Sequence, residues 1–244
     1  MPERSQIALV WVTLVFTTVY GFAMIFLFDM FPPPNATLSA AEIARFYAER
    51  AGDIKVGAIL ASWTGGTIFP LFFVVGVQIR RMEGERAVWG PFAMVSAGLM
   101  SIFLVVPPVL WGAAAFSPDR PAEITKAIHE LSVLSLVCTD QYFVFGWIAL
   151  SVACLLPKKV PDTPFPRWFG YFNIWLTLMI EAGAFGFFFK VGPFSWNGLF
   201  PFWLPFALFG LFIPMMSVLV IRALKAQMRD AGAGAAEGRV PARA

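Results

Sequence analysis

Asp140 and Glu181 each lie inside a long apolar stretch of the sequence. An Asp at the centre of a membrane helix costs about 2.5–3.5 kcal/mol on translocon scales, so it is expected to face a partner or a cavity. Asn173, Thr177 and Glu181 recur at helical spacing, and Asp140 lies in the run Cys-Thr-Asp-Gln-Tyr. We therefore predict a group that binds a ligand or a proton, made of Asp140, Glu181, Thr177, Asn173, Gln141 and Tyr142.

The depths of the two carboxyl groups agree. Asp140 lies 16 residues from Leu156, and Glu181 lies 14 residues from Arg167. At 1.5 Å per helical residue, these separations are roughly 24 and 21 Å. Residues 157–166 form a short connection, so the two helices are predicted to be antiparallel neighbours whose carboxyl groups meet. Such a pair can carry a proton, bind a cation or hold a polar ligand group, or it can serve only as hydrogen-bonding glue between helices.

A second group of candidates surrounds the connection that follows Glu181. Lys190 lies between the aromatic run Phe187–Phe189 and the segment Val-Gly-Pro-Phe-Ser-Trp-Asn-Gly at 191–198. This region is either an interfacial belt, in which Lys190 extends to water, or the lip of a pocket, in which Lys190 or Asn197 anchors a polar group. The candidates for this outer mouth are Lys190, Trp196, Asn197 and His129.

His129 is the single histidine of the chain. It either forms an interfacial polar pair with Glu130 or marks a point where protons enter. Asp140 lies 11 residues farther on, which is roughly 16 Å along a helix. Haem, zinc and di-iron centres need several clustered ligands, so no metal or cofactor site is predicted. The sequence also contains no Walker loop, Rossmann fingerprint, HExxH motif or nucleophile elbow.

The composition indicates that a bilayer surrounds these residues. Of the 244 residues, 59% are hydrophobic and 14% are charged, whereas a soluble domain has roughly 25% charged residues. The net charge of +3 is spread along the chain rather than gathered in a basic patch, which excludes nucleic acid as a partner. The predicted partners are the lipid bilayer, a hydrophobic small molecule and other membrane subunits.

Six apolar stretches are long enough to cross ~30 Å of hydrocarbon. They are approximately residues 7–28, 54–79, 88–116, 128–156, 168–189 and 199–221. The first is too long for a signal peptide, and no small-residue cleavage site follows it. We predict an all-α, polytopic membrane protein with a single six-helix bundle over 1–222 and a disordered cytoplasmic tail over 223–244.

The distribution of Lys and Arg predicts the orientation of the bundle. With the N-terminus inside, 12 of the 18 Lys and Arg residues lie on the cytoplasmic side. An even number of spans then places both termini in the cytoplasm. The expected location is the inner (plasma) membrane.

Two short helices are expected on the outer face. Ser39-Ala-Ala-Glu42 has the form of a capping box, and the apolar residues that follow share one helical face up to Ala51. These features are typical of an amphipathic surface helix. A second short helix is predicted to begin at Pro121 and to lead into the fourth span.

Glycines and prolines predict breaks inside several spans. The run Ser-Trp-Thr-Gly-Gly-Thr at 62–67 interrupts the second span, and Pro107-Pro108 are expected to break the third. Pro201, Pro205 and Pro214 punctuate the sixth. Such breaks survive at membrane depth only where protein or a cavity satisfies the freed backbone groups.

Several segments resemble a group of uncharacterised bacterial six-span integral membrane proteins. The segments are Leu-Ser-Ala-Ala-Glu-Ile-Ala-Arg-Phe-Tyr (38–47), Val-Gln-Ile-Arg-Arg-Met-Glu-Gly (77–84), Pro-Arg-Trp-Phe-Gly-Tyr-Phe-Asn (166–173) and Lys-Val-Gly-Pro-Phe-Ser-Trp-Asn-Gly (190–198). The resemblance covers nearly the whole chain except the tail. It implies a bacterial inner-membrane setting and no particular chemistry.

Three classes of function remain open. The first is a protein that binds or transports a small apolar or amphipathic molecule through the carboxyl pair. The second is a non-catalytic subunit of a larger membrane complex. The third is a membrane enzyme in which the carboxyl groups act as acid and base, and it is the weakest because neither a nucleophile nor a metal cluster accompanies them.

Overall fold

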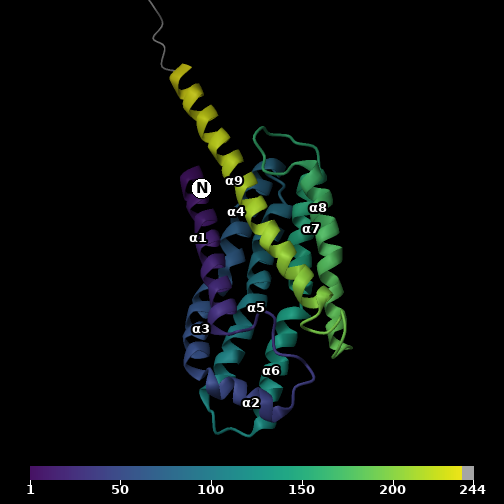
Figure 1. Cartoon of the computed structure of the whole chain (residues 1–244). Helices are drawn as coiled ribbons and strands as arrows, with labels where there is room; N and C mark the ends of the chain where they lie inside the picture. Colours follow the sequence, from purple (N-terminus) through teal and green to yellow (C-terminus); the bar gives the residue numbers. More distant parts are fainter. Residues whose placement is uncertain (238–244) are drawn as a thin grey trace, which may run out of the picture.

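The computed structural model describes residues 1–237 and is built from helices (Figure 1). Helices make up 79% of the described residues, among which no strand occurs. The elements are α1 (Glu3–Phe22), η1 (Ala23–Leu27), α2 (Ala40–Glu49), α3 (Ala51–Thr64), η2 (Gly65–Thr67), α4 (Ile68–Glu83), α5 (Trp89–Phe116), α6 (Ala122–Val137), α7 (Gln141–Leu155), α8 (Arg167–Glu181), η3 (Ala182–Phe187), η4 (Leu199–Trp203) and α9 (Leu204–Glu237).

Five helical stretches within residues 1–237 are long and apolar enough to cross a membrane. They are Glu3–Leu27, Ala51–Glu83, Trp89–Phe116, Ala122–Leu155 and Leu199–Ala233. The prediction of an all-helical, multi-pass membrane protein is confirmed at this level. The predicted span 168–189 corresponds to α8 and η3, which do not meet the same criterion of length and hydropathy. They pack against α7, α9 and η4.

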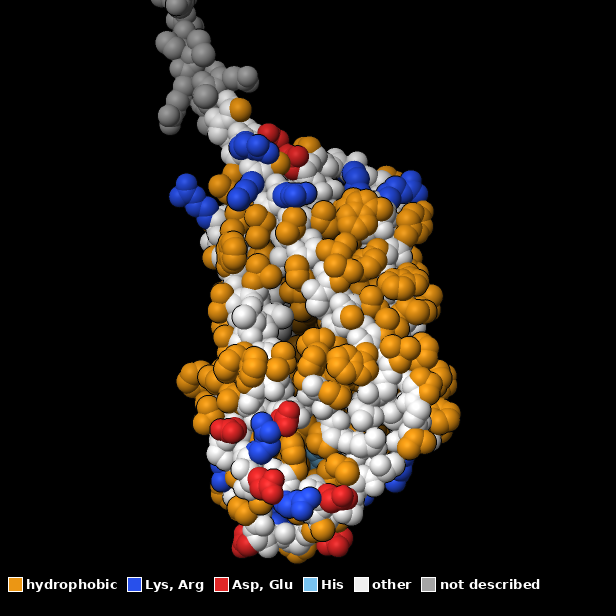
Figure 2. Space-filling model, in the orientation of Figure 1, with side chains coloured by type: hydrophobic (Ala, Val, Ile, Leu, Met, Phe, Trp, Pro, Cys, Tyr) orange, Lys and Arg blue, Asp and Glu red, His pale blue; other side chains and the backbone are white. Residues whose placement is uncertain are grey.

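Charged side chains gather at the two ends of the molecule. Figure 2 shows a broad apolar band on one face, with Lys and Arg prominent at the end where the chain begins and acidic side chains prominent at the other. Figure 1 shows that α1 begins and α9 leaves at the same end. The first and the last long helix therefore share the end of the molecule at which Lys and Arg are prominent.

Most of the long helical stretches are irregular within the bundle. The predicted break at 62–67 is confirmed, because the 3₁₀ turn η2 separates α3 from α4. Residues 138–140 separate α6 from α7, a break that we did not predict. In addition, α8 continues as the 3₁₀ segment η3, and the π-helical turn η4, which contains Pro201, precedes α9.

The prediction that Pro107 and Pro108 break the third span is wrong, since α5 is helical over 28 residues. Proline at position 108 has no N–H to donate to the carbonyl of Leu104 four residues earlier. The hydroxyl of Tyr20 in α1 donates to this oxygen instead, at 3.0 Å. Gly65 also packs tightly here, because a Cβ at Gly65 would lie 2.9 Å from the Leu104 oxygen. A neighbouring helix therefore satisfies the carbonyl group that Pro108 leaves free.

A chain of buried glutamines joins three helices near the N-terminal end of the bundle. Gln78 of α4 donates to the side-chain oxygen of Gln6 in α1, at 2.8 Å. Gln227 of α9 donates to the side-chain oxygen of Gln78, at 2.9 Å, and to the backbone oxygen of Asp162, at 2.8 Å. These bonds fix α9 against α1 and α4 without a buried charge.

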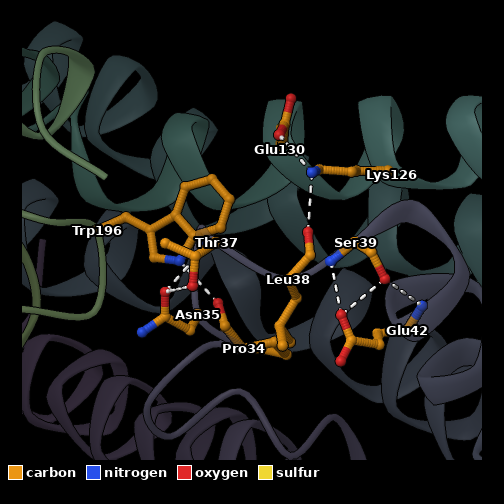
Figure 3. Close-up of polar contacts among 9 residues, drawn as sticks. All are labelled: Pro34, Asn35, Thr37, Leu38, Ser39, Glu42, Lys126, Glu130 and Trp196. Carbon is orange, nitrogen blue, oxygen red and sulfur yellow. Dashed lines mark hydrogen bonds and ion pairs between the residues drawn. The ribbon is translucent and has the colours of Figure 1, made fainter. Parts of the chain in front are cut away.

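At the opposite end, the capping box predicted for residues 39–42 is present at the start of α2. The Ser39 hydroxyl accepts from the Glu42 N–H at 3.3 Å, and the Glu42 carboxylate accepts from the Ser39 N–H at 2.7 Å (Figure 3). The side-chain hydrogen bond from Ser39 is the main reason that the pKa of Glu42 is lowered. Ile43 and Tyr47 are buried, so α2 packs on the bundle through its apolar face.

Two side chains from other elements hold the loop that leads into α2. Lys126 of α6 donates to the carbonyl of Leu38 at 2.8 Å, and Trp196 donates to the carbonyl of Pro34 at 2.7 Å (Figure 3). The second short helix, expected from Pro121, is not separate from the span. It is the beginning of α6, which runs from Ala122 to Val137 without interruption.

The C-terminal helix extends beyond its expected end. The last span was predicted to end at residue 221 and to be followed by a disordered tail at 223–244, whereas α9 continues to Glu237. Alanine has the highest helix propensity, and the Ala-rich composition of 231–236 favours this extension despite the intervening glycines. The rest of the predicted tail, 238–244, lies outside the described residues.

We predict that Tyr20→Phe lowers stability by about 1–3 kcal/mol, because it leaves the Leu104 carbonyl without a partner. The measurement is thermal unfolding of the purified protein in detergent. In a Pro108→Ala background, the restored N–H can bond to Leu104, so Tyr20→Phe is expected to have a smaller effect. An equal loss in both backgrounds would show that the Tyr20 hydroxyl does not compensate for Pro108.

Candidate binding site at the broken helices

Asp140 lies in the break between α6 and α7. It directly precedes the first residue of α7, but its carboxyl group does not cap the helix. The residue is 1% exposed, and neither carboxyl oxygen has a hydrogen-bond partner within the described residues. A buried polar group without a partner is unfavourable, and buried polar groups of this kind are rare in native structures. Asp140 is therefore the strongest functional candidate in the bundle.

The 3₁₀ segment η3 packs directly on this break, and its glycines make the contact close. A Cβ at Gly183 would lie 2.5 Å from Oδ2 of Asp140 and 2.8 Å from the carbonyl oxygen of Val137. A Cβ at Gly186 would lie 2.7 Å from the sulfur of Cys138. The interrupted part of the fourth span and the irregular end of α8 thus shield the carboxyl group together.

Glu181 is the last residue of α8, immediately before η3. Gly183, two residues farther on, packs against the Asp140 carboxyl, so Glu181 lies near the same break. Glu181 is half-buried, with Oε1 shielded and unpartnered within residues 1–237, and the side chain of Gln141 lies beside its carboxyl group. Gln141 and Tyr142 are exposed on the side of the bundle. The carboxyl pair therefore extends from a buried position at Asp140 to the lateral surface at Glu181.

The other two members of the predicted group hold the helices together. Asn173 donates to the backbone oxygen of Trp147 at 2.9 Å and to the hydroxyl of Ser151 at 2.7 Å, which ties α8 to α7. Thr177 donates to the Asn173 backbone oxygen at 2.8 Å. These hydrogen bonds hold the helices together, and neither Asn173 nor Thr177 lines the cavity described next, which Asp140 borders.

Asp140 borders a cavity of about 290 Å³ between α1, α5, the end of α6 and the beginning of α9. Its lining includes the aromatic rings of Phe103, Phe202, Phe206 and Phe209 and the prolines of η4 and α9. Figure 1 shows α1 and α9 next to each other on the face turned to the viewer, and the two helices are in contact. The cavity is of a size typical of small-molecule sites and is mostly apolar.

The remaining polar side chains of the lining already have hydrogen-bond partners. Thr17 bonds to Thr67 at 2.7 Å, Thr18 donates to the Leu14 carbonyl at 2.9 Å, and Tyr20 donates to Leu104. Asp140 is thus the lining side chain whose polar atoms are unsatisfied within the described residues.

The residues predicted at the outer mouth are separate from this cavity. His129 is fully buried, with Nδ1 at 2.9 Å from the Tyr47 hydroxyl and its ring against that of Trp196, 5.7 Å between centroids. It is a packed residue at the end of the bundle that carries α2, rather than an interfacial partner of Glu130. Asn197 accepts from Ser195 at 3.0 Å, and Lys190 is exposed. His129, Trp196, Asn197 and Lys190 do not line the cavity.

Sequence reasoning missed the residues that shape the cavity and cover Asp140. Tyr20 and Thr17 lie in the first apolar stretch, where no sequence motif distinguishes them from other polar residues. Gly183 and Gly186 lie in an Ala-Gly-Ala-Phe-Gly run directly after Glu181. Small residues at this spacing were the available signal, because they permit a close approach between elements.

No family model, curated protein or solved structure matches this chain. Within residues 1–237, no group of three or more His, Cys, Asp and Glu side chains is placed to hold a metal ion. The candidate site therefore rests on the geometry of the carboxyl pair and the cavity.

We predict that Gly183→Ala destabilises the protein by roughly 1–3 kcal/mol, because the added methyl group overlaps the Asp140 carboxyl and the Val137 carbonyl. Thermal unfolding in detergent measures the change. Gly98→Ala is the matched control, since a Cβ at Gly98 meets no atom within 4 Å. Asp140→Ala should reduce the penalty at Gly183. Equal unfolding temperatures for the two glycine variants would show that η3 does not pack on Asp140.

Proposed function

We propose that the protein binds, or binds and transports, a small apolar or amphipathic molecule in the cavity between α1 and α9, with Asp140 and Glu181 as its polar centre. The observation that carries this proposal is the unpartnered, buried Asp140 carboxyl at the wall of an apolar cavity. Charged groups at membrane depth are retained where they serve a function. Satisfied hydroxyls elsewhere in the lining leave Asp140 as the group that a ligand can pair with.

The way into the cavity is from the side of the bundle. Thr18 on α1 and Phe206 and Gly210 on α9 line the cavity and are also exposed at the surface. In a bilayer, this surface faces the hydrocarbon chains, where apolar molecules concentrate. A molecule dissolved in the membrane can therefore reach the cavity between α1 and α9 without crossing the polar ends of the bundle.

We further propose six membrane spans, with α8 and η3 as the fifth, and both termini in the cytoplasm of a bacterial cell. Support comes from the shared end at which α1 begins and α9 leaves (Figure 1), and from the excess of Lys and Arg on that side. The elements at the opposite end, α2 among them, then lie at the outer surface of the inner membrane.

A subunit role is the alternative, and one observation favours it. Gln141 is exposed and Glu181 is half-exposed on the lateral surface, among apolar side chains such as Phe145 and Leu178. Polar groups that face lipid at this depth are unfavourable, and a polar side chain from a partner helix would satisfy them. Co-purification of a second membrane protein that is lost on Gln141→Leu would support this alternative.

The binding proposal predicts saturable uptake of 4-phenyl-1-butanol by the protein in lipid nanodiscs, beyond partitioning into empty nanodiscs. Gly210→Phe should weaken binding about tenfold or more, because the added ring occupies the space that the ligand needs. A tenfold loss of affinity corresponds to roughly 1.4 kcal/mol of binding free energy. Gly98→Phe is the matched control, as a Cβ at either glycine meets nothing within 4 Å and Gly98 does not line the cavity. Equal uptake by Gly210→Phe and wild type would contradict the proposal.

The six-span arrangement predicts opposite accessibility for the two ends of α8. Lys190→Cys should react with a membrane-impermeant maleimide applied to intact cells stripped of their outer barrier. Lys159→Cys should react only after the membrane is opened. Both positions are exposed, and the native Cys138 and Cys154 are buried, which keeps the background low. Labelling of both positions from the same side would show that α8 does not cross.

A further inference from the structure

Among the described polar groups that line the cavity, the ones without a partner are hydrogen-bond acceptors. The lining hydroxyls of Thr17, Thr18 and Tyr20 are already bonded to the protein, whereas both oxygens of Asp140 are unbonded within the described residues. A molecule that fits this pattern must bring donors to the carboxyl group. A ligand with only acceptors would leave Asp140 unsatisfied and would add a second buried group without a partner.

The charged residues around the cavity favour a ligand with a positive charge. None of its lining residues is Lys, Arg or His, and Glu181, two residues before the glycine that packs on Asp140, brings a second carboxyl group to the break rather than a cation. An anionic ligand would meet like charge in apolar surroundings. A cation instead supplies the countercharge that a buried carboxylate requires.

The apolar lining fits the rest of such a molecule. Phe202 from η4 and Phe206 and Phe209 from α9, together with Phe103 from α5, present aromatic rings around the cavity. Aromatic faces attract ammonium groups, and their area binds hydrocarbon or aryl groups. The volume of about 290 Å³ accommodates a small single-ring amphiphile rather than a phospholipid.

The packing of η3 places a condition on binding. Both Asp140 oxygens are shielded, and Gly183 lies against Oδ2. A ligand donor therefore reaches the carboxyl group when η3 or residues 138–140 shift aside. These segments lack regular α-helical bonding, so a local shift leaves the continuous helices α1 and α5 in place.

We propose that the ligand of the α1–α9 cavity is a lipophilic amine, whose ammonium group pairs with Asp140 while its apolar body lies among the phenylalanine rings. This inference rests on the binding function proposed above and specifies its ligand class. No covalent step is involved. The same ion pair forms when an ammonium ion meets the carboxylate and when a neutral amine accepts the proton of the carboxylic acid.

The test compares 4-phenylbutylamine, 4-phenyl-1-butanol and 4-phenylbutyrate, which share a ring and chain and differ in the polar end. The full-length protein in nanodiscs of zwitterionic lipid is titrated with each, and empty nanodiscs correct for partitioning. The amine should bind at least about tenfold more tightly than the alcohol, which corresponds to roughly 1.4 kcal/mol. The carboxylate should bind most weakly. Equal affinities for amine and alcohol would overturn the inference and leave the binding function intact, whereas saturable binding of none of the three would overturn both.

Two variants assign the preference to a residue. Asp140→Asn keeps the size of the side chain and should abolish the amine preference while alcohol binding remains. Glu181→Gln removes the neighbouring charge and should reduce the preference by a smaller factor. Thermal unfolding of both variants confirms that they fold. An amine preference that survives Asp140→Asn, or that depends more on Glu181 than on Asp140, would overturn Asp140 as the anchor.

Discussion

The structure depends on one constraint: backbone groups freed by irregular helices must find partners inside an apolar bundle. The Tyr20 hydroxyl meets this constraint at α5, where it donates to the Leu104 carbonyl that Pro108 leaves free. The Thr67 hydroxyl of the 3₁₀ turn η2 is bonded to the same helix, α1, since it donates to the Thr13 carbonyl at 2.8 Å and bonds to Thr17. These hydroxyls come from α1 and η2, and both contacts fix α1 against the centre of the bundle.

Asp140 is a buried polar group that finds no such partner within the described residues. It lies in the break that separates α6 from α7, and the glycines of η3 allow that segment to cover the carboxyl group without offering it a donor. Asn173 holds α8 against α7 through Trp147 and Ser151, which places Glu181 beside the same break. The polar stripe on α8 therefore has two parts, since Asn173 binds the helices together and Glu181 extends the carboxyl pair to the surface.

Much of this arrangement was predictable from the sequence, because hydropathy, helix caps and glycine runs act locally. The apolar stretches, the capping box at Ser39 and the 3₁₀ turn at Gly65–Thr67 follow from such signals. The continuity of α5 was not predictable, because it depends on Tyr20, a residue 88 positions from Pro108. The break at 138–140 carries no proline or glycine, so its cause lies in tertiary packing. The cavity likewise requires the placement of α1 against α9, which no local pattern specifies.

Regular and irregular segments are distributed unevenly around the cavity. The cavity has one wall mainly from α1 and α5, which are continuous helices there, and another from Asp140, the π turn η4 and the start of α9, where the regular pattern is interrupted. Close-packed helices resist gradual deformation, whereas irregular turns can rearrange locally. Access to Asp140 then requires movement only of residues 138–140 or of η3, the irregular segments that cover its carboxyl group. The glutamine chain of Gln6, Gln78 and Gln227 fixes α9 near its far end, so its cavity-lining end can shift while the helix remains attached.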